Sequence, residues 1–263
     1  MKRNWLFFFP LVLLLIFLAA PLAAIFMRVW AQKGLWSTLR QPIVTEALRL
    51  SAVTSLSSLG LAVVLGTPLA YLLARHRFRG AALVDTLVDL PMVLPPTVAG
   101  VALLMAFGRR GVLGVWLDAI GIQLSFTTVA VILAQSFVST PFYIRAARAG
   151  FQSVDQELER VAYTLGHAPF SVFLRVTVPL AFPALLGGAV MAWARALGEF
   201  GATIMFAGNF LGRTQTMPLA IYSAMESDLT AALVLSAILI VVSFSVLLGV
   251  RLLLHRSPYG IYA

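Results

Sequence analysis

Two helical stripes of hydroxyl side chains are the first residues in this sequence that could act on a ligand. In each stripe the hydroxyls recur three or four residues apart, which places them on one face of a helix. Neutral hydroxyls can donate hydrogen bonds to a passing oxyanion without trapping its charge, and the same groups also bond helices to one another inside membranes. Both interpretations stay open from the sequence alone. The stripes are Ser51, Thr54, Ser55 and Ser58, and then Ser136, Ser139 and Thr140.

A single charged pair lies in a stretch that is otherwise apolar. Arg195 and Glu199 are one helical turn apart, so they can neutralise each other. Charges inside a membrane are costly and usually functional, and Arg195 could instead face an anion. If the apolar stretch ends near Arg195, both residues are merely interfacial.

Prolines interrupt another apolar stretch. Pro91, Pro95 and Pro96 each lack an amide donor, so that nearby carbonyl groups need other partners. Broken helices at membrane depth survive where they face protein or water. Pro95, Pro96 and Thr97 are therefore candidates for lining a pore, and a packing kink is an equal alternative. The segment 85–89 begins this stretch with two aspartates, where the helix dipole favours carboxylates.

Several chemistries are excluded by missing residues. The chain has no cysteine, which excludes disulfides and cysteine-ligated metals. A phosphate-binding loop needs a lysine directly after a glycine, and neither Lys2 nor Lys33 meets this condition. The metal-binding motif of intramembrane phosphotransferases is matched only faintly between Ala74 and Asp89, with the wrong spacing. We therefore predict a transport subunit that binds no metal or cofactor itself, and no enzyme.

The elements that must position these residues are membrane helices. Apolar types make up 60% of the 263 residues and charged types 11%, far from the composition of a soluble domain. Six uncharged runs of 19 to 26 residues are each long enough to cross a hydrocarbon core about 30 Å thick. They predict an all-α integral membrane protein with six transmembrane helices. The runs are 4–27, 50–74, 90–108, 119–144, 176–194 and 229–250.

Orientation follows from the lysine and arginine residues of the short loops. With the N-terminus in the cytoplasm, the cytoplasmic side holds eleven of these residues and the outer side seven. The bias predicts a multi-pass protein of the inner or plasma membrane with both termini in the cytoplasm. It also explains the net charge of +9 without nucleic-acid binding. The first run is too long for the core of a cleaved signal, so we expect it to remain as a helix.

The longest cytoplasmic loop predicts a helix, a glycine and a second short helix; we call residues 150–179 the elbow. Ser153 to Gln156 fits a capping box, Gly166 suits the left-handed turn that ends the helix, and a second helix follows from Pro169 to Thr177. An apolar stripe on the first helix lies either on its own bundle or in the groove of a soluble partner. The stripe consists of Val154, Leu158, Val161, Ala162 and Leu165.

The elbow resembles the cytoplasmic coupling loop of ABC importer permeases. The family pattern is Glu-Ala-Ala, three residues, Gly, nine residues, and Ile-x-Leu-Pro. Ala162, Gly166 and Pro179 match at the family spacing, and Arg160 replaces the glutamate with Glu159 one residue earlier. The resemblance implies that this loop contacts a separate ATP-binding subunit. The residues implied are Glu159, Arg160, Val161, Ala162, Gly166, Val176, Val178 and Pro179.

Segments 90–100, 194–203 and 213–219 resemble those of molybdate permeases, and sulfate and tungstate permeases share close versions. The resemblance implies a type I importer fold, two copies of this chain in the lipid bilayer, two ATP-binding subunits that hold ATP and Mg, and an extracytoplasmic oxyanion-binding protein. The expected substrate is molybdate, with tungstate or sulfate as alternatives. A secondary transporter would leave the elbow without a role. The expected parts are 1–45 (first helix and outer loop), 46–251 (transmembrane domain) and 252–263 (cytoplasmic tail).

Overall fold

The computed structural model describes residues 5–31 and 35–255. The described part of the chain forms helices and turns without any strand, so the predicted all-α fold class is confirmed. The predicted tail falls outside these residues from position 256 onward. In chain order the elements are α1 Trp5–Trp30, α2 Leu35–Leu39, α3 Pro42–Arg75, α4 Ala81–Val93, α5 Pro96–Phe107, α6 Gly114–Ala119, α7 Thr128–Ser153, α8 Gln156–Thr164, α9 Pro169–Val172, the π-helical turn η1 Phe173–Thr177, α10 Val178–Leu197, α11 Gly201–Ala207, α12 Met217–Ser227 and α13 Leu229–His255.

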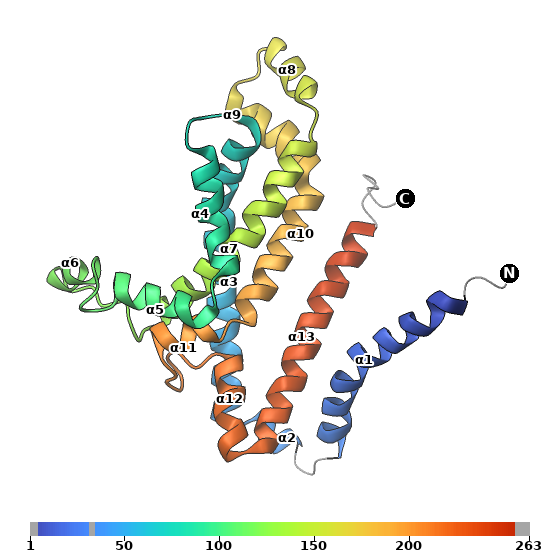
Figure 1. Cartoon of the computed structure of the whole chain (residues 1–263), viewed down its shortest axis with the longest axis vertical. Helices are drawn as coiled ribbons and strands as arrows, with labels where there is room; N and C mark the ends of the chain where they lie inside the picture. Colours follow the sequence, from blue (N-terminus) through green and yellow to red (C-terminus); the bar gives the residue numbers. More distant parts are fainter. Residues whose placement is uncertain (1–4, 32–34, 256–263) are drawn as a thin grey trace.

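The helix α7 is the centre of the bundle and packs against both α3 and α10 (Figure 1). Small side chains fill these contacts and let the helix backbones approach closely. Ala70 of α3, Ala147 of α7 and Ala192 of α10 are completely buried. All three helices are long and apolar enough to cross a membrane. The bundle therefore has two ends, and one of them carries α8 and α9 (Figure 1).

The third predicted span is a broken helix. The chain bends by 117° between α4 and α5, and the residue at the break, Leu94, is extended with ψ 136°. A residue that precedes a proline is pushed out of the helical region, and here two prolines follow in succession. Pro91 lies buried inside α4, so the prediction that it interrupts the helix is wrong. Within the described residues, five single helices could span a membrane, and this bent pair supplies the sixth when it is counted as one span.

The short helices α5 and α11 are pressed against each other beside this break. A Cβ atom at Gly100 would lie 2.7 Å from Met205 Cβ and 2.8 Å from the carbonyl oxygen of Ala202. Since the second neighbour is backbone, a side chain at position 100 would push the two helices apart. α10 ends at Leu197 before α11 begins at Gly201, so both helices of this contact follow a break in their own span.

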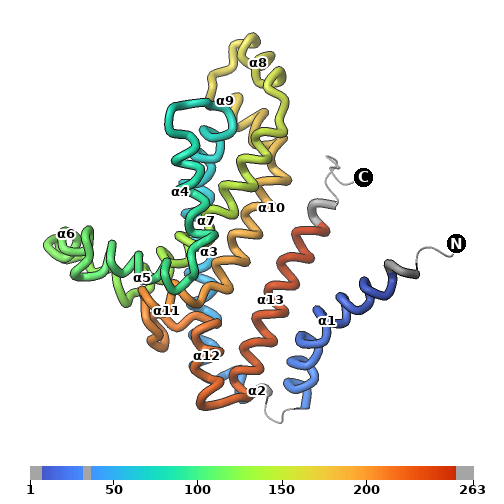
Figure 2. The backbone as a smooth tube through the Cα atoms, viewed as in Figure 1, coloured from blue at the N-terminus to red at the C-terminus, as the bar shows by residue number. Residues whose placement is uncertain are grey.

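The first helix stands apart from the bundle. In Figure 2, α13 lies between the central helices and α1, and α1 packs mainly on α13. Apart from Arg28, its described side chains are apolar, and most are exposed; Phe9 and Phe17 are 75% and 72% exposed. A surface of this composition suits contact with lipid or with another membrane helix. The candidate site residues lie elsewhere, from α3 to α11.

Candidate functional site

The first helix of the elbow, α8, begins two residues later than the sequence pattern predicts. α7 continues to Ser153, whose hydroxyl donates to the carbonyl oxygen of Gly150 at 2.8 Å. The N-cap of α8 is Asp155, whose carboxylate accepts a hydrogen bond from the amide of Glu157 at 2.9 Å. The capping box at Ser153 is therefore wrong: an aspartate caps the helix equally well, and Ser153 is already part of the preceding helix.

Gly166 ends α8 as predicted. Its φ is +84°, and a Cβ atom there would meet nothing within 4 Å. Only the backbone conformation requires glycine at this position, because the left-handed region costs other residues about 1–2 kcal/mol. The amide of His167 then donates to the carbonyl oxygen of Ala162 at 3.2 Å, which closes the turn in the manner of a helix C-cap.

The apolar stripe of α8 divides between the bundle and the outside. Val154 and Ala162 are buried, whereas Leu158, Val161 and Leu165 are 48%, 55% and 72% exposed. A helix that simply lay on its own bundle would cover all five side chains. Phe170 at the start of α9 is also 72% exposed. The elbow therefore presents an apolar surface outward, which we call the knob: Leu158, Val161, Leu165 and Phe170.

The polar residues of the elbow point in opposite directions. Arg160 is exposed and pairs with Glu157 at 2.5 Å along the same helix. Glu159 is 6% exposed and faces inward, where its Oε1 accepts from Arg75 Nη2 at 2.8 Å and from Thr177 Oγ1 at 2.7 Å. Val176 and Val178 are partly buried and Pro179 is exposed at the start of α10. Sequence reasoning gave Arg75 only a part in the orientation bias and gave Thr177 no role.

Arg195 and Glu199, the charged pair predicted at the fifth span, form an ion pair. Arg195 Nη1 lies 2.6 Å from Glu199 Oε2, and the glutamate side chain is 1% exposed. The other carboxylate oxygen accepts from the amide of Ala202 at 2.7 Å, at the N-terminal end of α11, where a negative charge is favoured. Of the three alternatives, mutual neutralisation matches this geometry. Arg195 is not an unpaired cation.

The first hydroxyl stripe lies inside the helix bundle. Ser51 Oγ accepts from the amide of Met217 at 2.7 Å, and Ser58 Oγ donates to the carbonyl oxygen of Ile132 at 3.0 Å. Ser55 donates to its own helix, at the carbonyl oxygen of Ala52. These bonds join α3 to α12 and α7, which is the interhelical role that the sequence left open. Three further hydroxyls of the two stripes, Thr54 Oγ1, Ser136 Oγ and Ser139 Oγ, are buried and have no hydrogen-bond partner within the described residues.

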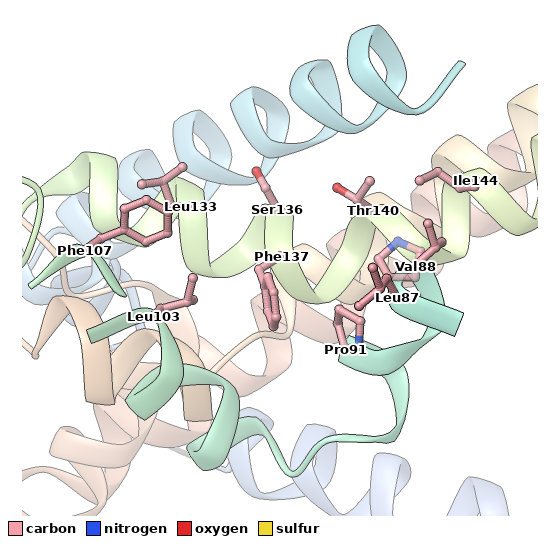
Figure 3. A pocket seen from close by; sticks show the side chains of 11 residues that line it. Leu87, Val88, Pro91, Leu103, Phe107, Leu133, Ser136, Phe137, Thr140 and Ile144 are labelled. Carbon is pink, nitrogen blue, oxygen red and sulfur yellow. The ribbon is translucent and has the colours of Figure 1, made fainter. Parts of the chain in front are cut away.

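Ser136 and Thr140 line a cavity of about 360 Å³ between α4, α5 and α7, as Figure 3 shows. Most of its other walls are apolar, among them Pro91, Leu103 and Phe137. The seven hydroxyl residues thus do not gather at one place. Pro95, Pro96 and Thr97 are exposed at the break, where Gly201 approaches Pro96 so closely that a Cβ atom there would lie 2.6 Å from Pro96 Cβ.

Two ion pairs fasten α4 to α7 above this cavity. Asp89 pairs with Arg145, with Arg145 Nε 2.5 Å from Asp89 Oδ1, and Asp85 pairs with Arg148. Neither aspartate is in the first turn of α4, which begins at Ala81, so the predicted interaction with the helix dipole is wrong. The carboxylates bond to arginines more than 50 residues away in the sequence instead.

Comparison with known proteins now decides the family. Residues 66–257 match the model described as "Binding-protein-dependent transport system inner membrane component". The chain belongs to this family of membrane transport subunits. That membership confirms the predicted ABC importer permease and the predicted transport subunit in place of an enzyme.

Individual proteins give the same result. The chain is 44% identical over 258 residues to the molybdenum transport system permease protein ModB of Mycobacterium bovis, covering 98% of this chain and 96% of that protein. It is 34% identical over 252 residues to a probable sulfate transport system permease protein of Nephroselmis olivacea, covering 94% and 88%. Among solved structures, a bacterial alginate ABC transporter in complex with a periplasmic protein bound to an alginate pentasaccharide matches with a TM-score of 0.74 at 18% identity, covering 97% and 95%. The structural match supports the fold alone.

Proposed function

We propose that this chain is the membrane-spanning subunit of an ATP-driven importer that moves molybdate from an extracytoplasmic binding protein to the cytoplasm. The observation that carries the proposal is the 44% identity to a molybdenum permease over 98% of the chain. The lower identity to a probable sulfate permease, 34%, makes sulfate the second candidate. Tungstate is a tetrahedral dianion like molybdate, and nothing in the chain separates the two.

The knob supports the proposal that a separate ATP-binding subunit supplies the energy for transport. An exposed apolar face on a short helix fits a groove of a partner protein, and Leu165 and Phe170 are both 72% exposed at the tip of the elbow. The chain has no phosphate-binding lysine of its own. ATP and Mg therefore belong to a separate subunit that docks on the knob, one for each of two copies of this chain.

The outer end of the bundle is where the binding protein would dock. The solved transporter of the same fold was crystallised with a periplasmic binding protein, and the delivered oxyanion would enter at the end opposite the elbow. The exposure of Thr97, beside Pro95 and Pro96 at the α4–α5 break, supports the proposal that this break contacts the ion on its path. Arg195 and Glu199 would support this path by holding the start of α11 in place, and neutral groups would pass the ion on without trapping it.

Both termini are proposed to be cytoplasmic. The described ends of α1 and α13 point toward the end of the molecule that carries α8, as Figure 1 shows. The chain lacks cysteine, so one cysteine placed at the exposed Gln156 is a clean reporter. A membrane-impermeant thiol reagent should label it only after cells are opened. Labelling from outside intact cells would overturn both the orientation and the importer assignment.

The function itself is tested by uptake into proteoliposomes that contain this chain, its ATP-binding subunit and the binding protein. We expect ATP-dependent accumulation of molybdate, competed by tungstate more strongly than by sulfate. Leu165→Asp places a charge on the knob and should reduce co-purification of the ATP-binding subunit at least tenfold. Phe78→Asp is the matched control, because Phe78 is also exposed, at 37%, in a different loop predicted to be cytoplasmic. Uptake of sulfate in preference to molybdate would contradict the proposed substrate.

A further inference from the structure

A buried polar cluster, which we call the clamp, joins the elbow to the transmembrane helices. It consists of Arg75, Glu159 and Thr177. Arg75 is the last residue of α3, Glu159 is in α8, and Thr177 is the last residue of η1, directly before α10. One carboxylate oxygen, Glu159 Oε1, accepts from both Arg75 and Thr177, at 2.8 Å and 2.7 Å. The clamp thus connects three elements through a single atom.

The clamp also holds the junction that precedes α8. Arg75 Nη2 donates to the carbonyl oxygen of Val154 at 3.0 Å, and Val154 is the residue between α7 and the cap of α8. α8 packs otherwise mainly on α9 and η1. The guanidinium of Arg75 therefore connects the end of α3 directly to the residue before the cap of α8 and to Glu159 within α8.

Burial makes this connection stiff and selective. The side chains of Arg75 and Glu159 are only 6% and 9% exposed. A buried ion pair contributes little net stability compared with well-packed apolar residues of similar size, and it is better explained by fixing one arrangement. A helix that only covers the surface of the bundle does not need to be held in one position. A helix that transmits a force from the knob to the ends of α3 and α10 does need to be held in this way.

We propose that Arg75 is a positioning residue for energy coupling: through Glu159 it makes α8, the end of α3 and the start of α10 move as one body. This proposal rests on the proposed function, in which an ATP-binding subunit pulls on the knob. Without the clamp, the ATP-binding subunit still binds the knob and hydrolyses ATP. The resulting movement of α8 then no longer moves the ends of α3 and α10.

The experiment measures molybdate uptake and ATP hydrolysis together in proteoliposomes that hold the whole transporter and its binding protein. Arg75→Gln and Glu159→Gln should each keep hydrolysis within about twofold of the wild type and lower uptake at least tenfold, so that the ATP consumed per ion rises at least fivefold. Arg75→Lys keeps the charge and should recover part of the uptake. Arg77→Gln is the control, because Arg77 is exposed two residues away and should change neither quantity.

A double variant separates coupling from folding. Arg75→Met with Glu159→Met removes both buried charges at once, so it should assemble and melt like the wild type while its uptake per ATP stays low. Normal uptake by this variant, or an equal fall of uptake and hydrolysis in both single variants, would overturn the proposal. If the wild-type transporter moves no molybdate at all, the proposed function fails first, and that result is distinct from a failure of the clamp.

Discussion

Two sets of ion pairs hold helices together toward the elbow end of this protein, and they differ in burial. The clamp pair Arg75–Glu159 has side chains 6% and 9% exposed. The α4–α7 pair Asp89–Arg145 has side chains 24% and 54% exposed. A buried pair resists separation because each charge would be left without water or partner, whereas a half-exposed pair is solvated when it opens. The elbow is therefore locked to the bundle, and α4 is fastened reversibly.

The packing around the two sets of ion pairs also differs, and it too leaves α4 less firmly held than the elbow. α4 packs mainly on α7, above the cavity of about 360 Å³. Its ends are a glycine with φ +92° at position 80 and the break at Leu94. The end of α3, in contrast, meets the aromatic rings of Phe151 and Phe173 through Tyr71. We therefore expect α4 to separate from the bundle more easily than the elbow does.

The largest expected effect is the loss of the whole Glu159 carboxyl group. Glu159→Ala, unlike Glu159→Gln, leaves both Arg75 and Thr177 without their acceptor in the buried clamp and should destabilise the fold by about 3–5 kcal/mol. The measurement is the apparent melting temperature of the purified transporter, and Asp89→Ala is the half-exposed counterpart. If both variants melt alike, burial does not separate the two sets of ion pairs.

A smaller effect is expected where α5 meets α11. Gly100→Ala puts a Cβ atom 2.8 Å from the backbone oxygen of Ala202, and overpacking of this kind costs typically about 1–3 kcal/mol. Gly60→Ala is the control, since a Cβ atom at Gly60 meets nothing within 4 Å. Lower thermal stability of the first variant alone would show that α5 is closely packed on α11 and cannot relax. Equal stability would show that this contact yields to an added methyl group.

The sequence predicted the membrane fold well because charge is excluded from hydrocarbon. The uncharged runs correctly indicated long apolar helices, and glycine at position 166 correctly marked the left-handed turn. The helix boundaries were predicted less accurately, because a helix can continue beyond the hydrocarbon when its charged residues find partners. α7 runs past the first charge to Ser153, because Arg145 and Arg148 are paired with the aspartates of α4 and the helix continues beyond the apolar run.

The clamp could not be predicted from the sequence. Arg75 and Glu159 are 84 residues apart, and each has an ordinary local explanation, as a cytoplasmic arginine and as a polar residue on a surface helix. The direction in which Glu159 points depends on how α8 sits on η1, which no local pattern encodes. The hydroxyl stripes failed to specify a role for the same reason. Spacing placed Ser51 and Ser58 on one face, but only packing showed that Met217 and Ile132 occupy it.

The smallest expected effect belongs to the α4–α7 pairs, and it is the most direct test of reversible fastening. Asp85→Asn and Asp89→Asn should each cost about 0–1 kcal/mol of stability, too little to unfold the chain. Ion pairs at this exposure weaken when salt shortens the Debye length from about 10 Å at 0.1 M to about 3 Å at 1 M. Accessibility of a cysteine placed at Thr140, which lines the cavity under α4, should therefore rise in both variants at low salt and rise in the otherwise wild-type chain only at high salt. If its labelling rate stays constant across salt and variants, α4 is held by apolar packing on α7, and the contrast with the clamp disappears.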